Sequence, residues 1–458
     1  MLIQTLLKTS GNLVKNPGFE DGLEHWILAG VNTGNNDPAE GTQVAILGPG
    51  VASISQDVEL CLWRRQPLLL SFIAYAANDS VGFGNLAAQV LWLDGSGNTL
   101  GTGFASFQSS RVFSDNSRIT FYGVTDTPPL GTVGARLIIS KGEGGNAPDL
   151  IALDQVILTP IKSSNLIQNP GFEAGLNFWN ATGFLPDFLN PFEGSANALA
   201  QAGGTLYQDI PIALLPWRSS FLLSFAVQGA AGSSLHVRLE WLNAANNIIG
   251  TPGLELSISG TTLNQQVGYL TYLNLSEPSP PGVVRARLLF TGNDVRIDQV
   301  VLTLTETKNL VLNPSFVSLD HWTAIGTVPQ VIPTPYEGNT VATINQGGGV
   351  LFQDVLLPFA AGRCFLLHFG LEYSGGRFPN GNIVVKVIWL NGFGREIGLG
   401  LNLGIPLFIF LRSEWLVYAG ITEAAPLLAA GARIQFTKSA GGTGGAVDVD
   451  HVVFGRLI

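Results

Sequence analysis

A motif of five residues followed by a tryptophan recurs along this chain and fixes its organisation. It reads Asn-Pro-Gly-Phe-Glu at Asn16–Glu20 with Trp26 and at Asn169–Glu173 with Trp179, and it returns in degraded form at Asn313–Val317 with Trp322. The tryptophans are 153 and then 143 residues apart. Because this period is too long for a solenoid repeat and matches the size of a whole domain, the sequence indicates one module copied three times.

The copies agree well beyond this motif, and every shared landmark keeps its order. The landmarks are Glu40-Gly41, Glu193-Gly194 and Glu337-Gly338; Gln56-Asp57, Gln208-Asp209 and Gln353-Asp354; Trp92, Trp241 and Trp389; and Asp154, Asp298 and Asp450. Between them, apolar and polar residues alternate with a period of two, as in Val237-Arg238-Leu239-Glu240-Trp241, and Gly-rich turns separate the runs. The pattern predicts an all-β fold of three tandem β-sandwich (jelly-roll) domains, at residues 1–161 with an N-terminal strand-like extension, 162–305 and 306–458.

The composition is poor in charge for a chain of this size. Charged residues make up 12% and hydrophobic residues 46% of the chain, whereas charged residues are roughly 25% of an average soluble domain. Sandwich cores account for part of the excess, so we expect the remaining charge-poor surface to be covered by a neighbouring module, another subunit or a ligand. The net charge of -10 and the lack of a basic run exclude nucleic acid as a partner. No run of 18 uncharged apolar residues is present, so no membrane span is predicted.

The N-terminal segment lacks the basic region and cleavage site of a signal peptide. We therefore expect synthesis in the cytoplasm and, for an assembled protein, an extracellular, cell-surface or spore-surface location reached by another route. A short apolar segment takes the place that Ile157–Ile161 has at the end of the first module; it consists of Ile3, Gln4, Thr5, Leu6 and Leu7. The hypothesis is that this segment docks on the last module of a neighbouring subunit, giving a homo-oligomer or polymer joined head to tail. The alternative is an unattached leader.

The shared landmarks resemble those of carbohydrate-binding modules of the galactose-binding-like jelly-roll superfamily, the type appended to xylanases and cellulases. The resemblance rests on Asn-Leu-Val-Lys-Asn-Pro-Gly-Phe-Glu with its Trp, the later Glu-Gly and Gln-Asp, and the terminal Asp-Gln-Val, and it covers nearly the whole chain in three passes. It implies a sandwich fold, and it implies polysaccharide as a possible partner. The fold also serves as a bare structural unit, so the ligand stays open.

The same resemblance implies a structural calcium ion in modules 1 and 2. Carried over by position, its ligands are Glu20, Glu40 and Asp154 in module 1, and Glu173, Glu193 and Asp298 in module 2. Three carboxylates and backbone carbonyls form a shell that suits calcium. Module 3 has Val317 at the first of these positions, so we expect no site or a weak one there. The alternative is that these carboxylates accept backbone N–H bonds in turns.

Sugar binding in this family needs exposed aromatic rings on a concave face. The six tryptophans at repeat-equivalent places are expected in the core, which leaves Trp63, Trp217 and Trp415 as candidate platforms. Polar residues that face away from the core tryptophans, such as Gln89, Arg238 and Lys386, differ from copy to copy, which favours a scaffold over three equal sugar sites.

Catalysis is not indicated by any motif. The chain has no His-Glu-x-x-His, no Gly-x-Ser-x-Gly and no phosphate-binding loop. The sequence therefore predicts a non-enzymatic rod of three sandwiches that assembles with copies of itself into a fibre or layer, with a polysaccharide-binding protein as the alternative.

Overall fold

The computed structural model describes residues 11–35, 37–60, 65–77, 84–113, 118–144, 149–216, 218–266, 268–374, 381–407, 410, 414–440 and 445–458. The chain folds into β-sandwiches, as the alternating sequence pattern predicted. The described part has one α-helix, α2 (Gly260–Gln265), and one short 3₁₀ helix, η1 (Ser110–Phe113). No helix in the described ranges is long and apolar enough to cross a membrane.

Module 1 consists of two five-stranded antiparallel sheets. We call outer the sheet with the order β1-β4-β9-β6-β7, and inner the sheet with the order β2-β3-β10-β5-β8. The outer strands are β1 (Ile27–Ala29), β4 (Ala52–Glu59), β9 (Gly134–Lys141), β6 (Leu86–Leu93) and β7 (Thr99–Gln108). The inner strands are β2 (Val31–Gly34), β3 (Val44–Leu47), β10 (Ile151–Pro160), β5 (Leu68–Ala76) and β8 (Arg118–Val124). Outer strands alternate buried and accessible residues, whereas β5 and β10 are buried on both faces, which shows that something covers the inner sheet.

Module 3 repeats both strand orders, as β17-β20-β25-β22-β23 and β18-β19-β26-β21-β24. Its outer strands are β17 (Thr323–Ile325), β20 (Gly349–Leu356), β25 (Gly431–Lys438), β22 (Asn382–Leu390) and β23 (Glu396–Pro406). Its inner strands are β18 (Thr327–Val331), β19 (Thr340–Ile344), β26 (Ala446–Gly455), β21 (Leu366–Ser374) and β24 (Leu416–Ile421).

Module 2 has the same plan, but long bent strands run through both layers. These are β11 (Asn180–Asp187), β12 (Asn197–Pro211), β16 (Arg285–Thr305), β13 (Ser220–Leu242) and β14 (Leu254–Ser259), in the order β11-β12-β16-β13-β14, with β15 (Leu270–Leu275) added on β13. Register shifts mark the bends, for example between Gly229 and Ser234.

The repeated motif forms the same loop three times. Asn16, Asn169 and Asn313 have φ values of 51°, 52° and 52°, a left-handed conformation that asparagine tolerates better than most residues. Each carbonyl oxygen accepts the indole N–H of the motif tryptophan, at 3.2, 3.1 and 3.1 Å. The motif is therefore structural, and all six repeat-equivalent tryptophans are buried, as predicted.

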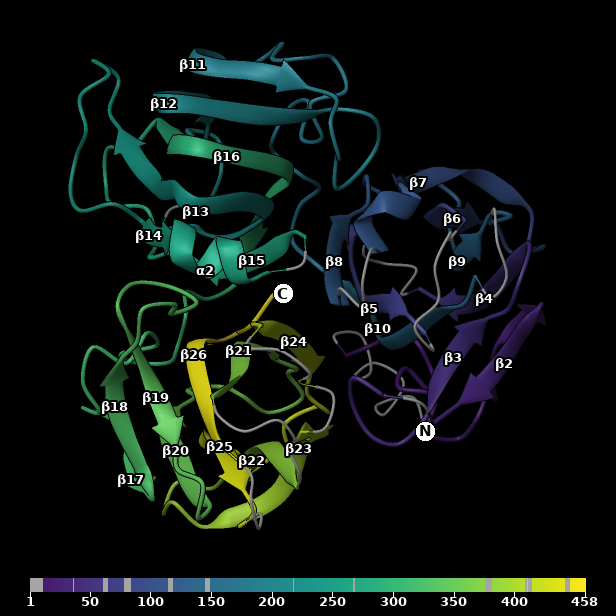
Figure 1. The fold of residues 1–458 in the computed structure, drawn as a ribbon, viewed down its shortest axis with the longest axis vertical. Helices are drawn as coiled ribbons and strands as arrows, with labels where there is room; N and C mark the ends of the chain where they lie inside the picture. The colour runs from purple at the N-terminus through teal and green to yellow at the C-terminus, as the bar shows by residue number, and fades with distance from the viewer. Residues whose placement is uncertain are drawn as a thin grey trace.

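The three modules form a closed triangle around a common centre (Figure 1). An apolar cluster at the centre takes side chains from equivalent inner-sheet positions of all three modules: Leu69, Tyr122, Val124 and Ile157; Leu222, Leu273, Leu275 and Val301; Leu366, Ala419 and Val453. The inner sheets are thus covered by one another, and neighbouring modules account for much of the charge-poor surface.

The modules also complete each other's cores at the three junctions. Phe192 of module 2 packs into the core cluster of module 1, and Tyr336 of module 3 packs into that of module 2. At the remaining junction Ala39 and Tyr75 of module 1 join the cluster of module 3. The expected rod is therefore wrong: buried apolar surface brings the last module back onto the first.

Candidate functional site

The Glu-Gly landmark of each module binds an edge strand of another module. Gly41 N–H donates to the carbonyl oxygen of Gly404 at 2.8 Å, and Gly404 N–H donates to Glu40 Oε1 at 3.0 Å. One residue of β23 is thus held at both its N–H and its carbonyl group. We call this pair of contacts the clamp.

The clamp recurs at the two junctions between consecutive modules. Gly194 N–H donates to Phe107 O at 2.7 Å in β7, where Glu193 also interacts with the Phe107 backbone. Gly338 N–H donates to Ser257 O at 3.0 Å in β14, and Ser257 N–H lies 3.4 Å from Glu337 Oε1. Since β7, β14 and β23 each lie at the edge of their sheet, the clamps cover strand edges that would otherwise be open to pairing with another chain.

Two glutamates of this landmark, Glu40 and Glu193, have largely buried carboxyl groups. Burial raises the pKa of Glu40 to about 7, with a further rise from the charge of Glu20 and an opposing effect of the Gly404 hydrogen bond. Burial, together with the charge of Glu173, raises the pKa of Glu193 to about 7. Glu40 and Glu193 thus bind protons more readily than ordinary glutamates, so we expect their two junctions to depend on pH near neutrality.

The carboxylates assigned to calcium lie close together but are engaged by protein donors. Glu20 Oε1 accepts the N–H groups of Thr42 and Gln43 at 2.8 and 2.9 Å, and Glu20 Oε2 accepts the Thr42 hydroxyl at 2.8 Å. Asp154 accepts the N–H groups of Gln155 and Glu40 at 2.7 and 2.9 Å.

Module 2 is arranged in the same way. Glu173 accepts from Ser195 and Ala196, and Asp298 accepts from Phe192, Glu193 and Gln299. Across the described part of the chain, no group of three or more acidic, His or Cys side chains could hold a metal ion. These hydrogen bonds are the ones that the alternative expects, in which the acids accept backbone N–H groups. Calcium stays a prediction from the resemblance.

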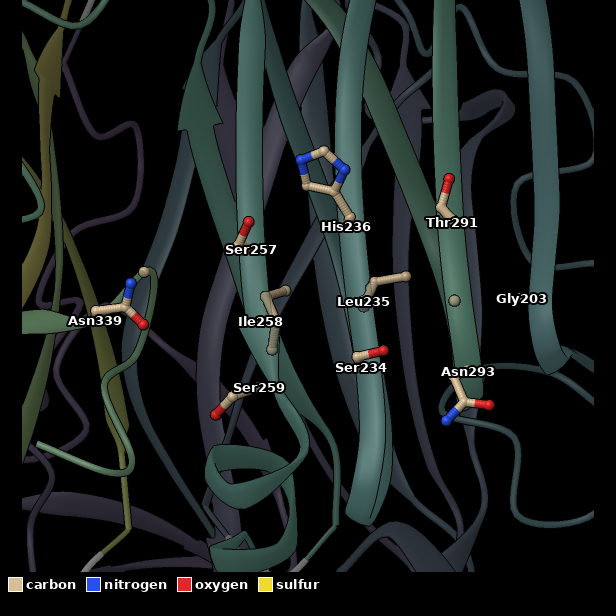
Figure 2. Close-up of a pocket in the computed structure, with 12 residues that line it drawn as sticks. Gly203, Ser234, Leu235, His236, Ser257, Ile258, Ser259, Thr291, Asn293 and Asn339 are labelled. Carbon is tan, nitrogen blue, oxygen red and sulfur yellow. The ribbon is translucent and has the colours of Figure 1, made fainter.

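A cleft of about 350 Å³ lies on the outer face of module 2, beside its junction with module 3. Two rows of polar side chains cross β14, β13 and β16, as Figure 2 shows. One row is Ser257, His236 and Thr291, and the next is Ser259, Ser234 and Asn293. Asn339, directly after the Glu-Gly landmark of module 3, lines the cleft from the other side.

Strand pairing explains why these side chains meet. Ser257, His236 and Thr291 are cross-strand partners, so their side chains project from the same face of the sheet. Gly203 and Gly292 also line the cleft and leave room in it. His236 Nε2 lies 2.9 Å from Glu255 Oε1, which orients the imidazole.

The equivalent rows of the other modules carry different groups. Where module 2 has Ser257 and His236, module 1 has Phe107 and Ala87, and module 3 has Gly404 and Val384. Phe107 is 44% exposed, so it occupies the space that Ser257 leaves open. Among the described rows, the combination of hydroxyl, imidazole and amide groups therefore belongs to module 2.

The predicted glycan and assembly residues contribute nothing to this cleft. Trp415 is 2% exposed, donates its indole N–H to Thr334 O at 2.7 Å and packs edge-on against Tyr336. It was wrongly assigned as a platform, since a buried ring cannot present its face to a sugar. Trp63, Trp217 and the segment Ile3, Gln4, Thr5, Leu6 and Leu7 lie outside the described residues.

The cleft was not predicted from the sequence, because exposed aromatic rings were taken as the mark of a sugar site. Its signal was the copy-to-copy variation of polar residues: His236 aligns with Ala87 and Val384 once the tryptophans Trp92, Trp241 and Trp389 are superposed in the sequence. That variation counted against three equal sites, but it is compatible with one site in one module.

No model of a known protein family matches the sequence, and no curated protein sequence matches it. Among solved structures, the enzymatically active domain of tailspike protein 4 from bacteriophage CBA120 aligns at 18% identity with a TM-score of 0.27, over 32% of this chain and 21% of that one. The tandem CBM22 domains of Xyn10C from Paenibacillus barcinonensis align at 14% identity with a TM-score of 0.27, over 65% of this chain and 99% of theirs. TmCBM61 in complex with β-1,4-galactotriose aligns at 18% identity with a TM-score of 0.26, over 33% and 99%. Because these identities and TM-scores are low, the function has to be argued from the site itself.

Proposed function

We propose that this protein binds carbohydrate without catalysis, through the cleft of module 2. The observation that carries the proposal is the pair of polar rows, Ser257-His236-Thr291 and Ser259-Ser234-Asn293, which face Asn339 across the open cleft. Hydroxyl and amide groups both donate and accept hydrogen bonds, which is what the hydroxyl groups of a sugar require. The resemblance of the repeated landmarks to carbohydrate-binding modules supports the same class of ligand, with hydroxyl, imidazole and amide groups in the described lining where the family resemblance implies aromatic rings.

The lining favours a short, uncharged segment of polysaccharide. His236 is the one ionisable side chain among the described lining residues, so a charged sugar would find little compensation there. The volume of about 350 Å³ lies near the lower end of the roughly 300–1,000 Å³ typical of small-molecule sites. Glycoside hydrolysis by the usual route needs a pair of carboxyl groups, and none of the described lining residues carries one, which supports binding alone.

The test is retention on polysaccharides with a pair of matched variants. Ser257→Phe places in module 2 the residue that module 1 has at the equivalent position, so the fold should accept it while the ring fills the cleft. Affinity electrophoresis against a panel of neutral polysaccharides should show retention of the wild type and at least about a tenfold weaker retention of Ser257→Phe. The converse change in module 1, Phe107→Ser, is the control and should leave retention unchanged. Lack of retention of the wild type on every polysaccharide would refute the proposal, as would equal retention of the two variants.

A structural role through assembly of copies is the second candidate. It is favoured by the clamps, because one of the three joins modules with no linker between them. The fibre and the cell- or spore-surface location stay predictions from the sequence.

A further inference from the structure

The contact between module 3 and module 1 differs from the other two junctions in its covalent setting. Its clamp joins Glu40-Gly41 to Gly404. Glu40 and Gly404 are 364 residues apart in the sequence. Modules 1 and 2 are joined by the linker after β10, and modules 2 and 3 by the linker after β16. We call the unlinked contact the seam. No linker joins module 3 to module 1 directly, so only non-covalent contacts hold the two modules together at the seam.

At two equivalent positions the linked junctions carry aromatic side chains and the seam does not. The residue before the landmark glutamate is Phe192 or Tyr336 at the linked junctions, and both are fully buried, but it is Ala39 at the seam. The second position lies at the start of β8, β15 and β24, the strands that pair with β5, β13 and β21. It holds Tyr269 and Trp415 at the linked junctions and Arg118 at the seam. Because a buried aromatic side chain removes 150–250 Å² from water, the seam gains less from these two positions than the linked junctions do. Its contacts lie elsewhere: Tyr75 of module 1, 2% exposed, packs into the core cluster of module 3, and Thr120 Oγ1 donates to Val417 O at 2.6 Å across the seam.

Opening of the seam would expose two complementary surfaces on one chain. Module 3 would present the edge of β23 around Gly404, and module 1 would present the Glu40-Gly41 loop. An exposed strand edge is a template for another backbone, and the loop that fits this edge is already encoded in every copy of the chain.

We infer that the seam is an exchangeable docking surface whose partner is a second copy of this chain, which inserts its module 1 in place of the original one. One linker, after β10, joins module 1 to module 2, so module 1 can leave as a unit. In the exchanged dimer, Glu40-Gly41 of one copy clamps Gly404 of the other, and the clamp on Phe107 forms again with module 2 of the other copy. Within one chain the effective concentration of module 1 is high, so the closed monomer predominates in dilute solution.

The experiment uses two full-length variants that each damage one side of the seam. Glu40→Ala removes the acceptor of the Gly404 N–H, and Gly404→Pro removes the donor to Glu40. A Cβ at residue 404 has no atom within 4 Å, and Pro406 in the same strand shows that this edge accepts proline. Each variant alone leaves one buried polar group without its partner, which is the costly outcome.

Mixing the two variants offers an exchange that removes both unpaired groups. In the exchanged pair, one seam joins the native Glu40 to the native Gly404. The other seam joins Ala at residue 40 to Pro at residue 404, so it contains neither an unpaired donor nor an unpaired acceptor. Light scattering after size-exclusion chromatography of the concentrated mixture should show at least about ten times more dimer than either variant alone. The chain that carries both substitutions should be monomeric, because its seam is matched in cis, and Gly404→Ala should behave as the wild type.

The inference is overturned if the mixture stays monomeric, or if either variant alone or the doubly substituted chain dimerises equally. Circular dichroism first establishes that each variant is folded. Should one not fold, two isotopically distinct populations of wild-type chain are mixed at the highest soluble concentration. Native mass spectrometry then decides, since mixed dimers support the exchange and their absence refutes it.

Discussion

The junction between modules 2 and 3 and the seam between modules 3 and 1 use the same clamp in different surroundings. At the linked junction Tyr336 packs on Tyr272 with ring centroids 4.4 Å apart, and their hydroxyl groups hold the neighbouring backbone across the contact. At the seam Ala39 replaces the aromatic ring, and Arg118 lies over Tyr75 at 4.0 Å and donates to Asp37 O within its own module. The two junctions thus share the clamp and differ in the aromatic side chains beside it, which are Tyr336 and Tyr272 at the linked junction and Tyr75 at the seam.

The largest expected effect is the loss of an aromatic side chain from the linked junction. Tyr336→Ala should lower the free energy of unfolding by about 4 kcal/mol, because it empties a fully buried site between two modules. Urea unfolding measures the change. Ala39→Gly at the seam should cost less than about 1 kcal/mol. Equal costs at the two positions would show that the junctions do not differ as described.

The next effect concerns the pH dependence of the seam. The folded pKa of Glu40 is about 7, above the unfolded value, so its stabilising contribution is fully present below pH 4.5 and is lost as the pH rises through 7. At pH 8 the buried charge costs about 3 kcal/mol relative to about pH 4.5. Glu40→Gln keeps an oxygen acceptor without the charge, and it should be the more stable protein at about pH 8 and equal to the wild type near pH 4.5.

Urea unfolding of both proteins at several pH values measures this difference. Glu193→Gln at the linked junction between modules 1 and 2 is the matched variant, since burial raises that pKa to about 7 as well. If Glu40→Gln follows the wild-type curve at every pH, Glu40 does not titrate as its burial implies.

A smaller effect of opposite sign is expected from His451 at the linked junction. Burial lowers its pKa, and its Nε2 lies 3.0 Å from Leu273 O of module 2. A folded pKa below the unfolded one means that stability is lost as the pH falls below 6.5. Modules 1 and 2 have Gln155 and Gln299 at this position, with similar φ values of 51°, 48° and 53° for Gln155, Gln299 and His451. His451→Gln should therefore lose less melting temperature between about pH 7 and pH 5 than the wild type does; an identical loss would exclude His451 as its source.

The smallest expected effect is that of removing calcium. Because backbone and hydroxyl donors already occupy the oxygens of Glu20 and Asp154, a chelator should leave the melting temperature unchanged within about 1 °C. Module 3, with Val317 in the glutamate position, provides the internal comparison. A calcium-dependent rise in melting temperature that disappears in Glu20→Gln would restore the family-type site.

The sequence was sufficient for the sandwich architecture because Asn16, Trp26 and their copies recur at domain spacing and form the same loop. It was also sufficient for the inference that charge-poor faces are covered. It could not show that the cover is the chain itself, because Glu40-Gly41 and Gly404 lie at opposite ends of the sequence and each reads as an ordinary repeat element. Residue type alone also could not show that Glu40 and Glu193, expected as calcium ligands, contact the backbone of a neighbouring module. His236 and its row carried a usable signal, since they differ from their copies at positions where the landmarks agree.

The three clamps join the modules in a closed triangle, so the last module lies beside the first. A change in the number of repeats would consequently leave junction surfaces uncovered. With one copy fewer, the two remaining sandwiches would expose the apolar inner sheets that the third one covers. A fourth copy would find no uncovered junction surface within the triangle. The outer surface of each repeat can therefore vary in sequence, whereas the inner sheets of all three repeats depend on one another.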